Sequence, residues 1–248
     1  MPIRFEFTGR RVILTGAAGD MGRRILRGFL DAGAKVYATD REGPRLDALQ
    51  GPADRLKKSA CDLTDVAAIR RSMREALDWL GGLDVLANVA GYMPIRPPLE
   101  LKESDWAAIL GVNLLAPYYC IQETIGALKA SASGRIISFA SIAGKMGGIG
   151  PNLPYAAAKA GLLAMTYNLA RELGKTGVTV NCILPGPADT GLHFESPPEM
   201  LARARQAHPM GRLTTPEDVW QAVLFLASEE AAHINGEALD VNGGFWTD

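Results

Sequence analysis

Two side chains four positions apart form the first candidate chemical pair in this chain, Tyr155 and Lys159 in the segment YAAAK. On a helix, residues at positions i and i+4 lie on the same face, so the ammonium group would lie near the phenol. A tyrosine titrates at about 10 in water, and a neighbouring cation favours the phenolate form. The pair is therefore a candidate proton donor and acceptor. The alternative is a surface tyrosine beside a solvated lysine.

A second candidate is the glycine-rich segment TGAAGDMG at residues 15–22, which follows the apolar run 11–15. Small residues allow backbone N–H groups at the start of a helix to approach a pyrophosphate closely. Asp40 follows about twenty residues later, at the end of a second apolar run, where a carboxylate can accept hydrogen bonds from an adenosine ribose. Together they predict dinucleotide binding. The alternatives are a turn that serves only packing and a solvated aspartate.

These residues need a scaffold, and the chain alternates short apolar runs with helix-periodic stretches. The predicted strands cover residues 11–15, 35–39, 56–60, 84–87, 135–139, 179–183 and 238–241, and the main predicted helices cover 21–31, 64–80, 104–129, 155–175 and 216–227. Strands that alternate with helices imply parallel pairing with right-handed crossovers. Continuously apolar strands indicate a sheet that is covered on both faces. We expect one α/β domain over residues 1–248.

Two of the predicted helices have recognisable ends. Thr64 is a plausible N-cap for the helix 64–80, and Gly81 is its expected stop. The segment Thr215-Pro216-Glu217-Asp218 has the pattern of a capped helix start with proline at the first helical position.

Composition and charge exclude several classes of protein. Hydrophobic residues make up 48% of the 248 positions, which is typical of a globular domain and excludes general disorder. The formal net charge of -1 argues against nucleic acid as the main partner. No apolar run is long enough to span a membrane, and the N-terminal segment has no signal-peptide core, so the chain is expected to be mature from its first residue.

Cysteines and histidines give no sign of a metal site. Cys61, Cys120 and Cys182 form no CxxC pair, and an odd number cannot all pair within one chain. We expect three buried thiols in a reducing, cytoplasmic compartment. The 3 histidines are too scattered to predict metal binding.

Taken in order, the motifs of the chain resemble the classical short-chain dehydrogenase/reductase family over essentially its whole length. They are TGAAGDMG at 15–22, NVAG at 88–91, Asn113, Ser141, YAAAK at 155–159, and PG at 185–186 followed by Thr190. The resemblance implies a Rossmann-type, doubly wound parallel sheet with helices on both faces. It also implies a homotetrameric oxidoreductase that uses a nicotinamide cofactor.

The resemblance assigns a role to each of four catalytic residues. Tyr155 would be the general acid and base, and it would bind the substrate oxygen together with the hydrogen-bond donor Ser141. Lys159 would lower the pKa of Tyr155 and bind the nicotinamide ribose. Asn113 would hold a water molecule that links Lys159 to solvent.

The resemblance also implies a cofactor site. It places the pyrophosphate against Gly16, Asp20 and Met21, the adenosine against Asp40, Arg41, Asp62, Leu63, Asn88 and Ala90, and the nicotinamide end against Tyr155, Lys159, Pro185, Gly186, Ala188 and Thr190. Asp40 would repel a 2′-phosphate and so favours NAD over NADP, whereas Arg41 acts in the opposite direction.

The chain departs from the family pattern TGxxxGxG at Asp20, where the family has glycine. A carboxylate beside a pyrophosphate is repulsive unless it points away or caps the following helix. We expect Asp20 to cap a helix that begins at Met21, with Arg23 and Arg24 screening its charge. A second departure, Val89 where asparagine is usual, has little expected consequence.

The expected substrate pocket is mostly apolar or small. It would be lined by residues 92–98, 142–149 and 188–195, the last within a lid of about 187–210. Arg96 and His193 are its polar groups able to bind an anion or sugar hydroxyls, although a solvent-facing position is the favoured alternative for Arg96. A small secondary alcohol, polyol or sugar with NAD fits this pocket best.

Two other functions stay open. A 3-oxoacyl carrier-protein reductase is the first, but reductases of that kind usually favour NADP, which Asp40 disfavours. A nucleotide-binding scaffold without turnover is the second, and only Asp20 favours it. The aromatic tail Gly243–Trp246 supports docking against a second subunit, unless it folds back over its own chain.

Overall fold

The computed structural model describes residues 5–148, 152–188, 190 and 198–247. Its centre is a parallel sheet of 7 strands in the order β3-β2-β1-β4-β5-β6-β7. The strands are β1 (Arg11–Thr15), β2 (Lys35–Asp40), β3 (Leu56–Ala60), β4 (Val85–Asn88), β5 (Arg135–Phe139), β6 (Thr179–Pro185) and β7 (Ala238–Val241). The predicted Rossmann-type, doubly wound single domain is confirmed.

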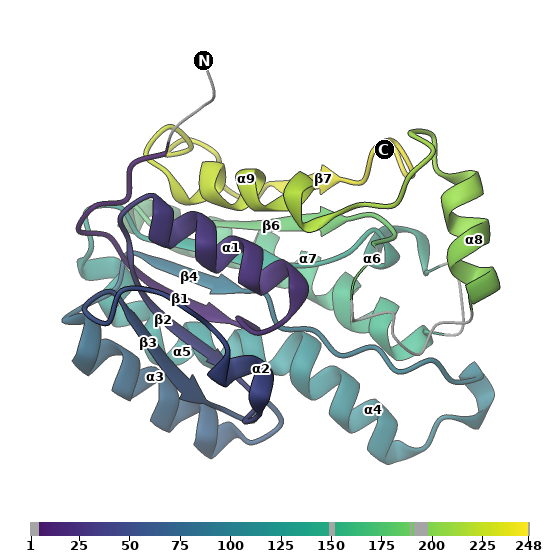
Figure 1. Ribbon diagram of the computed structural model, residues 1–248, viewed down its shortest axis with the longest axis horizontal. Helices are drawn as coiled ribbons and strands as arrows, with labels where there is room; N and C mark the ends of the chain where they lie inside the picture. The colour runs from purple at the N-terminus through teal and green to yellow at the C-terminus, as the bar shows by residue number, and fades with distance from the viewer. Residues whose placement is uncertain (1–4, 149–151, 189, 191–197, 248) are drawn as a thin grey trace.

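Helices cover both faces of this sheet (Figure 1). They are α1 (Asp20–Asp31), α2 (Pro44–Asp47), α3 (Val66–Leu80), α4 (Glu103–Leu110), α5 (Ala116–Ala130), α6 (Ala143–Met146), α7 (Leu153–Leu173), α8 (Pro198–Ala207) and α9 (Pro216–Ala227). Short 3-10 turns span Pro98–Glu100 and Gly174–Thr176, and a π-helical turn spans Gly111–Leu115.

Alternate side chains of each strand enter one of two apolar cores. On β1, Val12 and Leu14 pack with α1 and α9, whereas Ile13 packs with α3 and α5 on the opposite face. Because successive side chains of a strand point to opposite faces, a continuously apolar strand supplies both cores at once. The cores pack the sheet between its helices and leave the carboxyl ends of the strands at one edge.

The predicted helix ends are right at two places and wrong at one. Gly81 ends α3 in the left-handed conformation, with φ 73°, and Thr215 with Asp218 forms the capping box of α9. The N-cap of α3, however, is Asp65 and not Thr64, because the Asp65 carboxylate accepts the Ala67 N–H. The Thr64 side chain instead donates to Asp62, at 2.7 Å.

The predicted helix over residues 104–129 is two helices, α4 and α5, joined by the π-helical turn Gly111–Leu115. A π turn inserts one extra residue into the helical ladder and is frequent at functional sites. Asn113 lies within this turn and is completely buried. The helical periodicity continues through the turn, so the sequence pattern did not show the break.

The C-terminal tail folds back over its own chain. Phe245 and Trp246 pack against an apolar cluster that includes Leu162 and Leu184, and the Phe245 ring lies 5.6 Å from that of His208. The sequence left this position of the tail open as the alternative to docking against a second subunit. The tail therefore gives no support for a second subunit.

The predicted lid over residues 187–210 falls partly outside the described residues, since 189 and 191–197 are not described. Its described end forms α8, and Ala188 makes an isolated parallel bridge with Thr214.

Candidate active site

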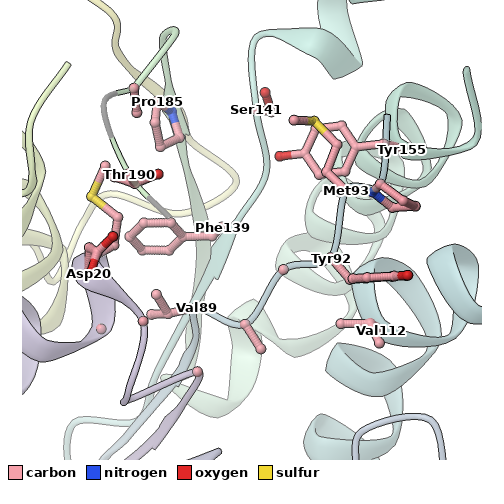
Figure 2. Close-up of a pocket in the computed structure, with 18 of the residues that line it drawn as sticks. Asp20, Val89, Tyr92, Met93, Val112, Phe139, Ser141, Tyr155, Pro185 and Thr190 are labelled. Atoms are coloured by element: carbon pink, nitrogen blue, oxygen red, sulfur yellow. The ribbon is translucent and has the colours of Figure 1, made fainter. Parts of the chain in front are cut away.

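A cavity of about 990 Å³ opens beyond the carboxyl ends of the strands. Its floor lies where the order of strands reverses, between β1 and β4, which is where open α/β sheets bind ligands. Figure 2 shows Asp20 and Tyr155 toward opposite ends of it, with Val89 and Phe139 between them. The cavity therefore has two ends of different character.

Ser141 and Tyr155 meet at one end of the cavity (Figure 2). Ser141 follows β5 and Tyr155 lies in the first turn of α7. The two elements approach closely because Gly144 of α6 lies directly on the α7 backbone: a Cβ there would be 2.8 Å from the carbonyl carbon of Lys159. The result places the Ser141 hydroxyl beside the Tyr155 phenol, where it favours the phenolate form.

Lys159 lies below this pair, one helical turn after Tyr155, and its side chain is buried. Its Nζ donates to the Phe139 carbonyl at 2.5 Å and lies 5.4 Å from the centre of the Tyr155 ring. The helical spacing therefore does place the ammonium group beside the phenol, as expected, and the end of β5 fixes its position.

The expected lowering of the Tyr155 pKa by Lys159 is wrong for this structure. Burial raises the pKa of Tyr155 to about 12, and only the hydrogen bond from Ser141 acts in the opposite direction. Burial also lowers the pKa of Lys159 to about 7. Desolvation disfavours the charged form of each group, and it is the largest cause of both shifts. A lysine with a pKa of about 7 can give and take a proton near neutral pH.

Asn113 is held by backbone groups at both ends of its side-chain amide. Its Nδ2 donates to the carbonyls of Ile109, at 2.9 Å, and Tyr92, at 2.7 Å, and its Oδ1 accepts the Tyr92 N–H at 3.3 Å. Asn113 therefore fixes the segment after β4 that forms one wall of the cavity. It does not itself line the cavity among the described residues.

The glycine-rich turn forms the opposite end of the cavity, and two of its glycines are required by packing. Gly16 has φ +68°, and a Cβ there would lie 2.5 Å from the Ala90 Cα, while a Cβ at Gly22 would lie 2.0 Å from the Gly16 carbonyl oxygen. Gly19 differs, because its φ of -69° suits any residue and the nearest atom to a Cβ would be 3.4 Å away. Gly19 lines the cavity, so its missing side chain leaves the backbone accessible to a ligand.

Asp20 does not cap α1, contrary to expectation. The N-cap is Gly19, and α1 begins at Asp20 itself. The Asp20 carboxylate accepts from the guanidinium groups of Arg23, at 2.7 Å, and Arg45, at 2.6 Å. An acidic residue in the first helical turn is still favoured by the helix dipole.

The charge of Asp20 is thus balanced at the cavity edge by two cations, only one of which was expected. Arg24, expected to screen Asp20, pairs with Glu217 at 2.7 Å and stacks on the Trp220 ring.

Asp40 joins β2 to the glycine-rich turn. Its Oδ2 accepts the Ala18 N–H and its Oδ1 accepts the Arg41 N–H, both at 2.8 Å. Each carboxylate oxygen can accept a further hydrogen bond, so the group can still bind ribose hydroxyls. Asp62 lies nearby, and hydrogen bonds from the Thr64 N–H and hydroxyl hold the pKa of Asp62 below its usual value.

The cavity brings together most of the cofactor residues predicted from the sequence. They are Gly16, Asp20, Met21, Asp40, Arg41, Asp62, Leu63, Ala90, Tyr155, Lys159, Pro185, Gly186, Ala188 and Thr190. Asn88 is the exception, since it is buried beneath the cavity, where its Oδ1 has no hydrogen-bond partner.

Several cavity residues were not found from the sequence. Gly19, Arg45 and Asn152 line the cavity, as do Met200 and Leu201 of α8, which lie beyond the segment named for substrate contact. The glycine pattern at residues 15–22 could have indicated Gly19, whereas only the tertiary structure brings the other four to the cavity.

The two polar residues named for the substrate pocket gain little support. Arg96 does not line the cavity among the described residues; its side chain is 56% exposed and lies 3.8 Å from Asp105. His193 lies outside the described residues.

The described residues contain no group of three or more His, Cys, Asp or Glu side chains arranged to hold a metal ion. None of the helices in the described part is both long and apolar enough to cross a membrane.

Comparison with known proteins identifies the family. Residues 16–246 match the family model described as Enoyl-(Acyl carrier protein) reductase. The 3-oxoacyl-(acyl-carrier-protein) reductase FabG of Vibrio harveyi is 35% identical over 239 residues, which cover 96% of this chain and 98% of that protein.

Solved structures agree with this match. A short-chain dehydrogenase/reductase from Brucella melitensis, described as a glucose/ribitol dehydrogenase, superposes with a TM-score of 0.92 at 29% identity, covering 99% of this chain and 100% of that one. A protein from Beutenbergia cavernae, described as an NAD(P) dependent gluconate 5-dehydrogenase with bound NADP, has a TM-score of 0.89 at 32% identity, with 98% and 99% covered. The chain belongs to the short-chain dehydrogenase/reductase family of nicotinamide-dependent oxidoreductases.

Proposed function

We propose that this protein transfers a hydride between NAD and a small secondary alcohol or ketone, such as a polyol or sugar, at a site formed by Asn113, Ser141, Tyr155 and Lys159. The observation that carries the proposal is the buried contact of Ser141 with Tyr155, directly above Lys159, at one end of a cavity large enough for a dinucleotide and a small substrate.

The residues of the cavity fit a dinucleotide. Gly19 leaves backbone accessible at the start of α1, and the arginines on Asp20 remove the repulsion that its charge would exert on a pyrophosphate. When bound, the nicotinamide supplies the hydride acceptor or donor. Lys159 and Tyr155 would hold its ribose, and Pro185, Gly186, Ala188 and Thr190 would form the wall beside its carboxamide.

The protein's own contribution is to hold the substrate oxygen and move its proton. Ser141 donates a hydrogen bond to that oxygen, and Tyr155 exchanges a proton with it. Lys159, with a pKa of about 7, can return a proton to Tyr155 near neutral pH. Asn113 keeps the wall formed by residues 91–93 in place through its bonds to Tyr92, and it would position a water molecule for the relay.

Asp40 supports NAD as the preferred cofactor, because a 2′-phosphate beside its carboxylate would meet a like charge. The bound NADP of the Beutenbergia protein shows that a similar protein can take the phosphorylated cofactor. Arg41 and Arg45 also line this end of the cavity and would attract the phosphate. The proposed preference is therefore clear but not absolute.

A 3-oxoacyl carrier-protein reductase is the second candidate, and the similarity to the Vibrio harveyi reductase favours it. The two functions differ in cofactor and in the size of the substrate. A nucleotide-binding scaffold is disfavoured by the intact set of Ser141, Tyr155 and Lys159.

The deciding experiment follows the absorbance of reduced nicotinamide with secondary alcohols, polyols, simple ketones and 3-oxoacyl thioesters, each with NAD and NADP. Turnover of small alcohols with NAD supports the proposal. Turnover confined to 3-oxoacyl thioesters with NADPH supports the second candidate. Binding of NAD without turnover of any compound would leave only the scaffold.

We further propose a homotetramer, based on large apolar side chains left exposed on helices α5 and α7. Tyr118 is 42%, Leu153 is 45% and Tyr167 is 39% exposed. Exposed apolar groups that gather on one face mark interaction surfaces. A monomeric mass by light scattering at micromolar concentration would contradict this assembly. The three free, buried cysteines support a reducing compartment, the cytoplasm.

A further inference from the structure

Asn152 lines the cavity close to Tyr155, and the proposed hydride transfer does not use its side chain. It is the N-cap residue of α7, three positions before Tyr155, and it is 9% exposed. Asparagine at this position usually accepts a hydrogen bond from the N–H of the second or third helical residue. The Asn152 side chain makes no such bond.

The sequence of α7 explains in part why the Asn152 side chain accepts no hydrogen bond from the helix. Its second residue is Pro154, which has no N–H to donate. Within the described residues, the Asn152 side-chain oxygen has no hydrogen-bond partner and is closed off from solvent, although a polar atom in that situation is rare and costs free energy. The side-chain nitrogen lies 3.8 Å from the Met93 sulfur, which is a weak acceptor. The amide is therefore without a strong partner at either end.

The two ends of this amide face different surroundings. The oxygen lies against Gly148, where an added Cβ would come within 2.3 Å of it. The nitrogen lies toward Met93, which lines the cavity and packs in one apolar cluster with Tyr155. Figure 2 shows Met93 beside the Tyr155 ring. The N–H end of the amide is thus the one that lies on the side of Met93 and Tyr155.

The wall around Tyr155 is otherwise apolar. Met93, Ile109, Ala143 and Ala156 form the cluster that contains the tyrosine. Such a wall accommodates the carbon skeleton of a substrate, and a hydrogen bond made inside it is little weakened by water. An amide donor in this setting has few uses for the fold and a clear use for a ligand oxygen.

We propose that Asn152 binds a second oxygen of the substrate, a carbonyl, hydroxyl or carboxylate oxygen near the carbon that exchanges hydride. This inference rests on the proposed function and narrows it. The favoured substrates are hydroxy ketones, polyols and oxo acids or esters, and not alcohols or ketones with a single oxygen.

The test compares 2-butanone with 3-hydroxy-2-butanone and ethyl acetoacetate, using the full-length protein and NADH. The wild type should have a lower KM for the two compounds with a second oxygen. Asn152→Leu, of similar volume, should raise those KM values about tenfold, the effect of one lost hydrogen bond. Its activity on 2-butanone should stay within about twofold.

Two further variants separate polarity from shape. Asn152→Asp should be worse than Asn152→Leu for both compounds with a second oxygen, because a carboxylate offers no donor and repels an acceptor oxygen. Met93→Leu alters the same wall and removes only the weak sulfur acceptor, which leaves the Asn152 amide in place, so it should keep the preference. An unchanged preference in Asn152→Leu would overturn the proposal.

A binding measurement keeps this test separate from the proposed function. The thermal shift of the protein with NADH is recorded with and without each compound. If no compound turns over, a stabilisation by 3-hydroxy-2-butanone that Asn152→Leu abolishes supports the role of Asn152 while the proposed function fails. Equal shifts in the wild type and in Asn152→Leu would overturn the role. Stabilisation by NADH alone confirms that each variant is folded.

Discussion

The two ends of the cavity hold their polar groups in different ways. At the catalytic end, Lys159 is 2% and Asn113 is 0% exposed, and both donate to backbone carbonyls. At the end formed by the glycine-rich turn, the side chain of Asp20 is 25% and that of Arg45 is 55% exposed, and the two are held by a charge pair. One end is built into the core of the fold, whereas the other is assembled from side chains at the surface.

This difference predicts how strongly an amino-acid substitution at each end of the cavity should affect the protein. Interactions in a buried site are strong, and removal of a partner there leaves an uncompensated polar group. Exposed ion pairs contribute little because water and salt screen them. The departure from the family pattern at Asp20 lies at the exposed end, where its cost is small. Substitutions should therefore have large effects at Tyr155 and small effects at Asp20.

Tyr155→Phe should give the largest effect. It removes the proton donor and leaves the ring in its apolar cluster, so kcat should fall by at least about a hundredfold, as for loss of a general acid. Binding of NADH, measured by fluorescence titration, should be nearly unchanged. Residual activity within about tenfold of the wild type would show that another group moves the proton.

Lys159 should make stability depend on pH. The pKa of Lys159 is about 7 in the folded protein, whereas that of an unfolded lysine is about 10.4. Between these pH values the unfolded chain binds more protons, so the free energy of unfolding rises with pH. From pH 7 to pH 9, urea titrations should show the wild type gaining roughly 2 kcal/mol relative to Lys159→Met.

Tyr155→Phe is the matched control for this measurement. Because burial raises the pKa of Tyr155 above its ordinary value, that tyrosine is neutral in both states through this pH range. Tyr155→Phe should therefore follow the wild type between pH 7 and pH 9. Parallel pH profiles for the wild type and Lys159→Met would mean that Lys159 keeps an ordinary pKa in the folded protein.

Asp40 should produce a moderate effect, confined to the choice of cofactor. Two like charges about 4 Å apart at an effective dielectric constant near 20 repel by roughly 4 kcal/mol, and even half of that exceeds a tenfold preference. We expect NAD to be used at least tenfold more efficiently than NADP in kcat/KM. Asp40→Ala should narrow the gap mainly by improving NADP.

Asp40→Asn is the control for structure, because its side-chain oxygen can still accept the Ala18 N–H while the charge is gone. It should resemble Asp40→Ala in cofactor choice and the wild type in thermal stability. Equal efficiency of the wild-type protein with NAD and NADP would show that Asp40 does not face the ribose.

The contrast between the two ends of the cavity also decides which of their features the sequence could predict. The strands follow from short apolar runs, and the placement of Tyr155 and Lys159 on one helical face follows from the helical repeat, so both can be predicted from local sequence. The partner of Asp20 does not, because Arg45 reaches it only through the position of α2, 25 residues along the chain. The direction of the Tyr155 pKa shift likewise depends on how deeply the fold buries the phenol, which spacing alone does not reveal.

Asp20→Gly, which restores the family residue, should give the smallest effect. It removes one negative charge near the expected pyrophosphate, but Arg23 and Arg45 already offset that charge. The dissociation constant for NADH should fall by no more than about fivefold, which corresponds to about 1 kcal/mol. Because the groups are exposed, the gain should shrink as salt rises from low to physiological concentration. Arg45→Met is the matched variant, and it should weaken binding, since it leaves the Asp20 charge less balanced. If Asp20→Gly weakened NADH binding tenfold or more, the carboxylate would be a direct cofactor ligand, and the end formed by the glycine-rich turn would be as finely fixed as the catalytic end.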